Sequence, residues 1–208
     1  MIEVPSNALL VLVSAPSGGG KTTLCEQVIA TNASAVRAVT CTTRPPRKGE
    51  REGLDYYFLD AASFKRRVAA GEFLEHATVY GNSYGTLKSE VIEKLNQGQD
   101  VLLSVDVQGA AAIREKAQAE AGLQGVLVTV FITPSSLSLL EKRLKRRGQD
   151  SDEVIAKRLK VARQEIAQSK HYDYLIISTT VAEDLRRMQA ILDAEKMRSG
   201  RVQAPDQE

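Results

Sequence analysis

A glycine-rich loop between an apolar segment and a helical segment constrains this chain more than any other feature. Residues Leu9–Val13 are apolar without interruption, which is typical of a strand covered on both faces. The loop Ala15-Pro16-Ser17-Gly18-Gly19-Gly20-Lys21-Thr22-Thr23 follows, and Lys21–Ala30 then has helical character. The loop matches the pattern G-x-x-x-x-G-K-[ST] except at its first position, where Ala15 replaces glycine.

The composition of this loop suits the phosphates of a nucleotide. Glycines let backbone N–H groups surround phosphate oxygens, and the N-terminus of the following helix adds a partial positive charge. We expect all nine residues to contact ATP, with Lys21 bridging the β- and γ-phosphates and Thr22 ligating Mg²⁺. The alternative is a flexible loop that binds nothing. The strand before it and the helix after it argue against that alternative.

Short apolar runs alternate with helical segments along much of the remaining chain. The predicted strands are Leu9–Ser14, Val101–Val105, Leu127–Ile132 and Tyr174–Ser178, and the later predicted helices are Gln108–Ala119, Leu137–Arg147, Glu153–Gln168 and Glu183–Met197. The last helix is preceded by Thr180, which together with Glu183 fits a capping box. This alternation predicts an α/β fold with a doubly wound parallel sheet.

Two segments interrupt the alternation. The first, residues 40–98, is rich in proline, glycine and tyrosine, and predicts short strands with helices at Ser63–Ala70 and Leu87–Gln97. The second is a pair of basic helices within residues 137–168. We therefore expect a core of residues 1–37, 99–134 and 169–198, an inserted lobe at 38–98, a lid at 135–168 and a flexible tail at 199–208.

Composition argues against several classes of partner. The formal net charge of +2 does not suggest a non-specific nucleic-acid binder. The apolar run Ala8–Val13 is too short for a membrane span or a signal sequence, so no membrane partner is expected. Two cysteines, Cys25 and Cys41, require no disulfide framework, and a reduced cytoplasmic protein is the simplest expectation. The oligomeric state stays open, and a homo-oligomer is one of the options.

Four motifs in a fixed order make residues 8–197 resemble the guanylate kinases, in particular the bacterial ones. They are the phosphate loop, Thr42-Thr43-Arg44-Pro45-Pro46-Arg47-Lys48-Gly49-Glu50, Phe73-Leu74-Glu75, and Gly81-Asn82-Ser83-Tyr84-Gly85-Thr86. The resemblance implies a P-loop NTPase-type fold with an inserted lobe for the nucleoside monophosphate and a helical lid. It also implies an enzyme, an ATP:GMP phosphotransferase with Mg²⁺ as cofactor and the small molecules ATP and GMP as substrates.

The resemblance further implies a role for individual residues. Four match positions that hold the phosphate of GMP: Arg44, Arg47, Tyr56 and Tyr84. Four match positions around guanine or its neighbouring waters: Thr40, Glu75, Thr86 and Asp106, the last also a candidate to reach Mg²⁺ through a water. Three match lid arginines that close on the phosphates of ATP: Arg143, Arg147 and Arg158. Lys21, Arg44 and the three lid arginines form the expected catalytic set.

The chemistry of these side chains agrees with those roles. Arginine binds phosphate oxygens in a bidentate manner, and tyrosine hydroxyls add neutral hydrogen bonds. Guanine presents two adjacent donors, N1–H and the 2-amino group, which match the two oxygens of Glu75; adenine would leave that carboxylate unpaired. Each residue taken alone has a simpler interpretation, namely a solvated loop or helix charge, a cap, or a tyrosine packed in a small core.

Two further segments depart from the family pattern, besides Ala15. Ser104 stands where the family usually has the first Asp of an Asp-x-Asp pair, which leaves Asp106 as the carboxylate near Mg²⁺. Ile177-Ser178-Thr179-Thr180 stands where an Asn-Asp-Asp run usually lies near the base of ATP, so the preference for ATP is less secure than the assignment of GMP. Two other functions stay open: an enzyme for another phosphorylated acceptor, such as a sugar phosphate, and an inactive module that binds proteins.

Overall fold

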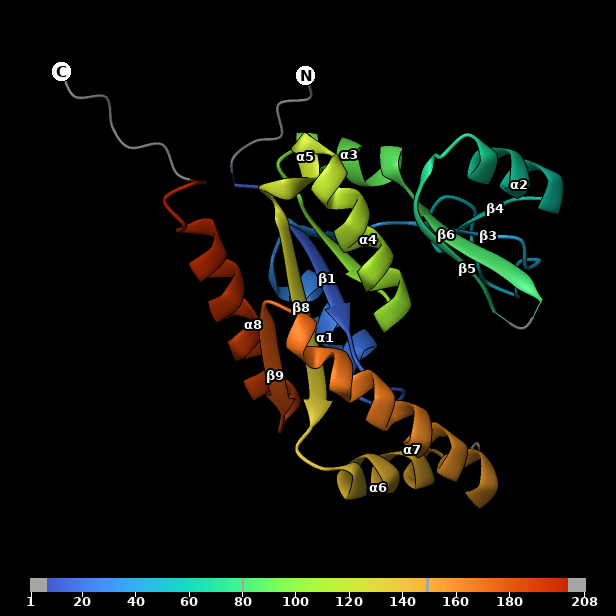
Figure 1. Ribbon diagram of the computed structural model, residues 1–208, viewed down its shortest axis with the longest axis vertical. Helices are drawn as coiled ribbons and strands as arrows, with labels where there is room; N and C mark the ends of the chain where they lie inside the picture. Colours follow the sequence, from blue (N-terminus) through green and yellow to red (C-terminus); the bar gives the residue numbers. More distant parts are fainter. Residues whose placement is uncertain (1–6, 80, 149, 202–208) are drawn as a thin grey trace.

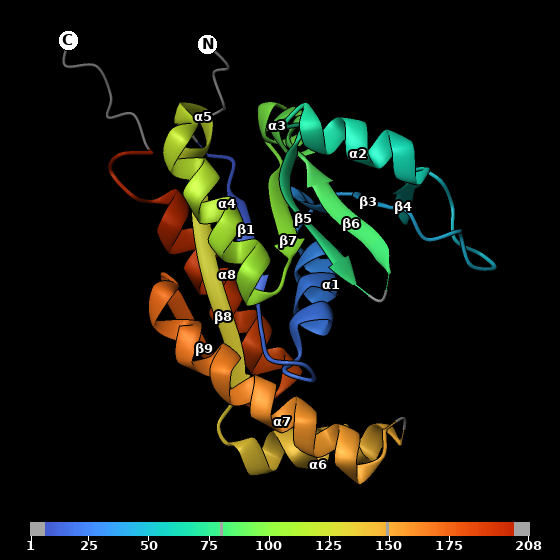
Figure 2. The ribbon, with the colours of Figure 1, turned by 45° about the vertical axis from the view of Figure 1, so that its right-hand side comes forward.

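The main body of the protein is a parallel sheet of five strands. The computed structural model describes residues 7–79, 81–148 and 150–201. The strand order is β2-β7-β1-β8-β9, with every neighbouring pair parallel. Figure 1 labels β1, β8 and β9, and Figure 2 also labels β7. The bounds are β1 Leu10–Ser14, β2 Ala35–Arg37, β7 Asp100–Ser104, β8 Leu127–Pro134 and β9 Tyr174–Ser178. The predicted doubly wound α/β fold is confirmed.

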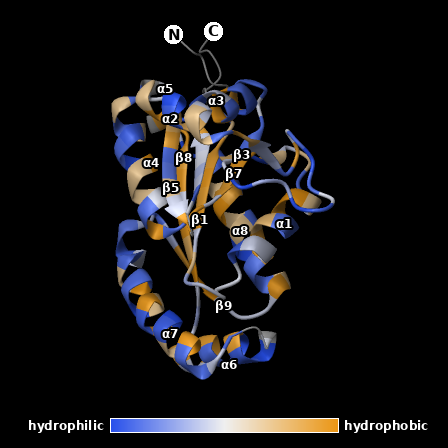
Figure 3. Ribbon diagram, turned by 90° about the vertical axis from the view of Figure 1, so that its right-hand side faces the viewer, coloured by the Kyte–Doolittle hydropathy of each residue, from blue (hydrophilic) through white to orange (hydrophobic). Residues whose placement is uncertain are grey.

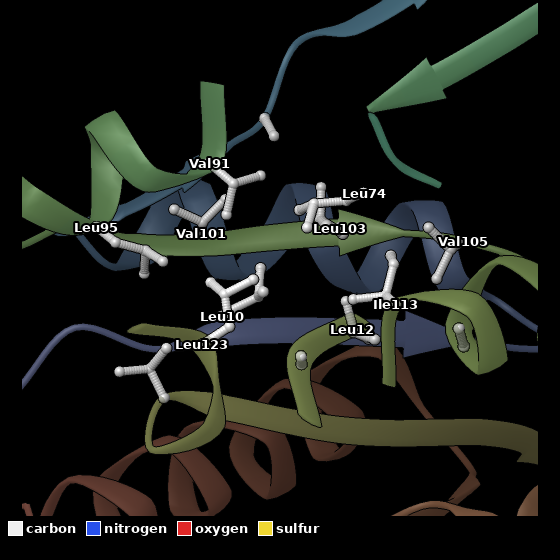
Figure 4. Close-up of a cluster of buried hydrophobic side chains, with 14 of the residues drawn as sticks. Leu10, Leu12, Leu74, Val91, Leu95, Val101, Leu103, Val105, Ile113 and Leu123 are labelled. Atoms are coloured by element: carbon white, nitrogen blue, oxygen red, sulfur yellow. The ribbon is translucent and has the colours of Figure 1, made fainter. Parts of the chain in front are cut away.

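Helices cover both faces of this sheet. On one face lie α1 (Lys21–Thr31) and α8 (Val181–Lys196), which pack against Leu9, Val11 and Val13. On the other face lie α3 (Lys88–Asn96), α4 (Val107–Ala119) and α5 (Ala121–Gln124), which pack against Leu10 and Leu12 (Figure 4). Because side chains alternate along β1, one uninterrupted apolar run supplies both cores.

A second, smaller sheet stands to one side of the main body (Figures 1 and 2). Its order is β4-β3-β6-β5, formed by β3 (Thr40–Thr42), β4 (Tyr56–Phe58), β5 (Phe73–Val79) and β6 (Asn82–Leu87). Its core contains Cys41, Phe64, Phe73 and Leu87, with Phe64 contributed by α2 (Ala61–Ala69). The antiparallel pairing of β5 with β6 places Glu75 opposite Thr86.

The basic helices form a unit beyond the end of β8. They are α6 (Leu137–Arg147) and α7 (Asp152–Ala167), and they pack through Leu140, Leu144, Ile155 and Ala162. Hydrophilic residues are prominent on both helices where they face outward (Figure 3). Gly148 ends α6 with φ 63°, a left-handed conformation that glycine adopts without strain.

The observed elements differ from the predicted ones mainly at their ends. Thr180 caps α8 by accepting a hydrogen bond from the N–H of Glu183, so the helix begins at Val181 and not at Glu183. The short strand β2, the short helix α5 and a 3₁₀ turn at Gln168–His171 were not predicted, because three or four residues carry no readable periodicity. The predicted tail lies outside the described residues from position 202 onward.

No helix in the described part of the chain is long and apolar enough to cross a membrane.

Candidate functional site

The phosphate loop leaves the carboxyl end of β1 and turns into α1. Two of its glycines have positive φ, Gly18 at 86° and Gly20 at 103°, and the N–H of Gly19 donates to the carbonyl of Pro16 at 2.7 Å. A side chain on Gly19 would meet Ala15 and Pro16 at 2.9 Å, so the turn has no room for one. The predicted residues Ala15–Thr23 together line a hollow of about 130 Å³. The backbone is thus shaped for an anion before any ligand arrives.

Lys21 lies at the base of this hollow. Its ammonium group donates to the carbonyl of Val105, beyond the end of β7, at 3.0 Å. Burial lowers the pKa of Lys21, while the negative charges of Asp106 and Glu165 act in the opposite direction. The charge is therefore held close to the loop, with donors left over for phosphate oxygens.

Glu165 is a residue of this site that sequence analysis missed. It belongs to α7, and burial raises the pKa of its carboxyl group, while the nearby backbone N–H of Ser17 and the charge of Lys21 act in the opposite direction. Its Oε2 atom is buried without a hydrogen-bond partner among the described residues. The carboxyl group of Glu165 therefore brings α7 close to the phosphate loop. In the sequence Glu165 is one charged residue among many on an amphipathic helix, and no local signal sets it apart.

On the second sheet, the predicted phosphate ligands Arg44, Tyr56 and Tyr84 gather in one place. The guanidinium of Arg44 lies over the Tyr56 ring at 5.5 Å, and the rings of Tyr56 and Tyr84 are 6.3 Å apart. One terminal nitrogen of the Arg44 guanidinium also donates to both carboxylate oxygens of Glu50, at 2.8 and 2.9 Å, and this contact lowers the pKa of Glu50. Glu50, which was not predicted as a site residue, therefore orients Arg44. The side chain of Arg47 is exposed on the same loop.

Glu75 belongs to β5, and its side chain lies between the second sheet and α4. The hydroxyl of Thr86 donates to its Oε1 at 2.8 Å, and burial raises the pKa of Glu75. A Cβ atom on Gly109 would lie 3.6 Å from its Oε2, so the carboxylate sits against the first turn of α4. Asp106 caps that helix by accepting from the N–H of Gly109 at 2.7 Å. Glu75, Thr86 and Asp106, predicted near guanine, are therefore neighbours, while Thr40 begins β3.

The predicted lid arginines occupy different places. Arg143 donates to the hydroxyl of Ser178 at 3.2 Å and lines a cavity beside the phosphate loop. Arg158 pairs with Asp150, at 3.2 Å, within the α6–α7 unit. The side chain of Arg147 lies outside what the structure describes. Arg146 and Lys142, which were not predicted, also line the cavity.

The groups available for a metal ion are few but chemically suitable. Thr22 is exposed in the first turn of α1, and Ser104 and Asp106 are exposed where β7 meets α4. The described residues contain no group of three or more acidic, histidine or cysteine side chains placed to hold a metal. A hydroxyl, one carboxylate oxygen and the phosphates of a nucleotide fit Mg²⁺, which keeps several of its waters.

Comparison with known proteins gives a consistent result. The family model described as guanylate kinase matches residues 7–195. The guanylate kinase of Carboxydothermus hydrogenoformans is 44% identical over 194 residues, covering 93% of this chain and 92% of the relative. That of Symbiobacterium thermophilum is 43% identical over 193 residues, covering 93% and 88%. The crystal structure of guanylate kinase from Anaplasma phagocytophilum matches with a TM-score of 0.70 and 33% identity, covering 95% and 91%.

Proposed function

We propose, from the premise that this chain belongs to the guanylate kinase family, that it transfers the γ-phosphoryl group of ATP to GMP. The products are ADP and GDP, and the enzyme is a nucleoside-monophosphate kinase. The observation that carries the choice of GMP is the pair formed by Glu75 and Thr86 at 2.8 Å. A half-buried carboxylate there offers two acceptors to the N1–H and 2-amino donors of guanine, and a neighbouring hydroxyl fixes its orientation.

We infer that the reaction needs no general base, because the attacking phosphate of GMP is already an anion. Arg44, with Tyr56 and Tyr84, would hold the acceptor phosphate, while the loop and Lys21 hold the donor. Arg143 and the other lid arginines would neutralise charge as the phosphoryl group moves. Mg²⁺, when bound by Thr22 and by Asp106 through water, would neutralise the charge of the donor phosphates.

We also infer that the second sheet and the α6–α7 unit move toward the core when substrates bind. Phosphoryl transfer must exclude water, because water would otherwise hydrolyse ATP. The division proposed from the sequence, with residues 38–98 and 135–168 as moving lobes, suits this need. The closeness of Glu165 to Ser17 would couple movement of the lid to the phosphate loop. Buried, unpaired Cys25 and Cys41 suit a reduced cytoplasmic setting.

A panel of acceptors tests the proposed function. We expect ADP release with GMP, and at most weak release with AMP, CMP, UMP or a sugar phosphate such as glucose 6-phosphate. A coupled assay of ADP measures the rates, and titration calorimetry with ATP and with GMP measures binding. Equal rates with GMP and AMP would contradict the role of Glu75. Failure to bind either nucleotide would favour the protein-binding module.

Ser104→Asp tests how the enzyme holds Mg²⁺. A carboxylate suits Mg²⁺ or its bound waters better than a hydroxyl does, and the side chain of Ser104 is exposed at the end of β7. We expect the Mg²⁺ concentration for half-maximal activity to fall by about threefold or more, since a contact worth about 0.7 kcal/mol has this effect. Activity is measured against Mg²⁺ at fixed ATP and GMP. An unchanged titration would mean that Asp106 and the phosphates suffice.

A further inference from the structure

A cavity of about 510 Å³ adjoins the phosphate loop on the side away from the second sheet. It is bounded by the loop, by α6, and by the turn from β9 into α8, and it shares Gly18, Gly20 and Thr23 with the phosphate hollow. Its volume is within the usual range for small-molecule sites. A triphosphate held in the loop would place its nucleoside in this cavity. The residues that line the cavity therefore determine which base the phosphoryl-donor nucleotide can have.

Several polar groups in the wall of this cavity form hydrogen bonds with one another. Asp184 is buried, and its two oxygens accept from the hydroxyl of Ser178 at 2.7 Å and from the N–H of Thr179 at 3.0 Å. The hydroxyl of Ser178, itself buried, also accepts from Arg143 at 3.2 Å. Ser178 thus uses its donor and an acceptor inside the wall. Because the Asp184 carboxylate and the Ser178 hydroxyl are both buried and bonded within the wall, they are poorly placed to distinguish one base from another.

The remaining side chains that line the cavity discriminate poorly between one base and another. Thr179 and Thr180 are exposed, and a hydroxyl rotates to donate or to accept as its partner requires. Leu139 and Val181 provide apolar surface, while the cationic side chain of Arg146 can stack on any base. Adenine presents an amino donor at C6 and an acceptor at N1, whereas a 6-oxopurine presents the reverse. Hydroxyls satisfy both patterns, in contrast to the fixed carboxylate of Glu75 in the acceptor site.

We propose that the donor site accepts 6-oxopurine nucleoside triphosphates, GTP and ITP, as phosphoryl donors in addition to ATP, an inference that rests on the proposed function. With GTP, the bond between the γ-phosphorus and the β–γ bridging oxygen breaks, and a phosphate oxygen of GMP forms the new bond. The electron pair of the broken bond stays on the departing diphosphate, so the products are two molecules of GDP. The reaction balances without any further reactant.

Donor kinetics with the unmodified enzyme test this proposal. With GMP as acceptor, kcat/KM is measured for ATP, GTP and ITP, using a γ-labelled donor and following label in GDP. We expect the kcat/KM for GTP and that for ITP each to be within about 30-fold of the value for ATP, because a site with fixed donors and acceptors discriminates by about 10⁴-fold and rotatable hydroxyls do not. Preference for ATP over either of them by more than this overturns the proposal. Absence of labelled GDP with ATP itself would instead contradict the proposed function.

Thr179→Asp supplies a second test, because it adds a fixed acceptor to the cavity wall. The carboxylate would accept from the 6-amino group of adenine and repel the oxygen of a 6-oxopurine. We expect the ratio of kcat/KM for ATP to that for ITP to rise by about tenfold, as a single directed contact can provide. Thr31→Asp is the matched control. Thr31 is the last residue of α1, at the end of the helix away from the phosphate loop, and the change should leave the ratio of kcat/KM values unchanged. An unchanged ratio in Thr179→Asp overturns the assignment of this wall to the base.

Discussion

Glu75→Gln is expected to raise the KM for GMP by about 30- to 1,000-fold, which corresponds to a loss of about 2–4 kcal/mol. The change keeps the shape of the side chain but replaces one acceptor by an amide donor. One contact with guanine then sets donor against donor, at a side chain that is already partly buried. Thr86 can still donate to the remaining oxygen, so the fold of the second sheet should be preserved.

Steady-state kinetics, with each substrate varied in turn, measure this effect. The KM for ATP should change little, because the phosphate loop and the cavity beside it are built from other residues. Glu72→Gln is the matched control: Glu72 lies three residues earlier and pairs with Arg67 on the surface. If Glu75→Gln leaves the KM for GMP within twofold of the unmodified enzyme, Glu75 does not read guanine, and a sugar phosphate becomes the better acceptor.

Lys21→Met is expected to lower kcat by about 100-fold or more, since an electrostatic contact of this kind contributes about 3 kcal/mol in the transition state. Methionine keeps the length of the side chain but removes the only cationic side chain of the loop Ala15–Thr23. The ammonium of Lys21 makes one hydrogen bond to the backbone, at Val105, and its other donors remain for phosphate. The fold should persist, because an apolar side chain replaces a partly buried charge.

Turnover with saturating ATP and GMP measures this effect, and thermal unfolding measures the stability. Lys65→Met is a suitable control, because Lys65 is exposed on α2 and belongs to no part of the phosphate site. Near-normal turnover of Lys21→Met, with an unchanged melting temperature, would refute the assignment of the phosphate loop. A large fall in melting temperature would instead assign Lys21 a structural role.

Local patterns in the sequence predicted most of the core. The apolar run of β1, the glycines of the loop and the cap at Thr180 each depend on neighbouring residues, so their structure could be predicted without knowing the rest of the fold. The four motifs likewise predicted that Arg44 and Glu75 bind GMP. Helix and strand ends shifted by one or two residues, because fraying and capping at the ends are decided by single hydrogen bonds.

Contacts between distant segments were decided by the tertiary structure alone. Glu165 comes close to Ser17, and Glu75 comes close to Gly109, although the two residues of each pair lie far apart in the chain. The sequence revealed that Ser178 departs from the family pattern. Only the fold revealed that its hydroxyl is held between Arg143 and Asp184. The physical reason is that hydrogen bonds and burial depend on which side chains are in contact in the folded chain. Periodicity along the sequence carries no information about contacts between distant segments.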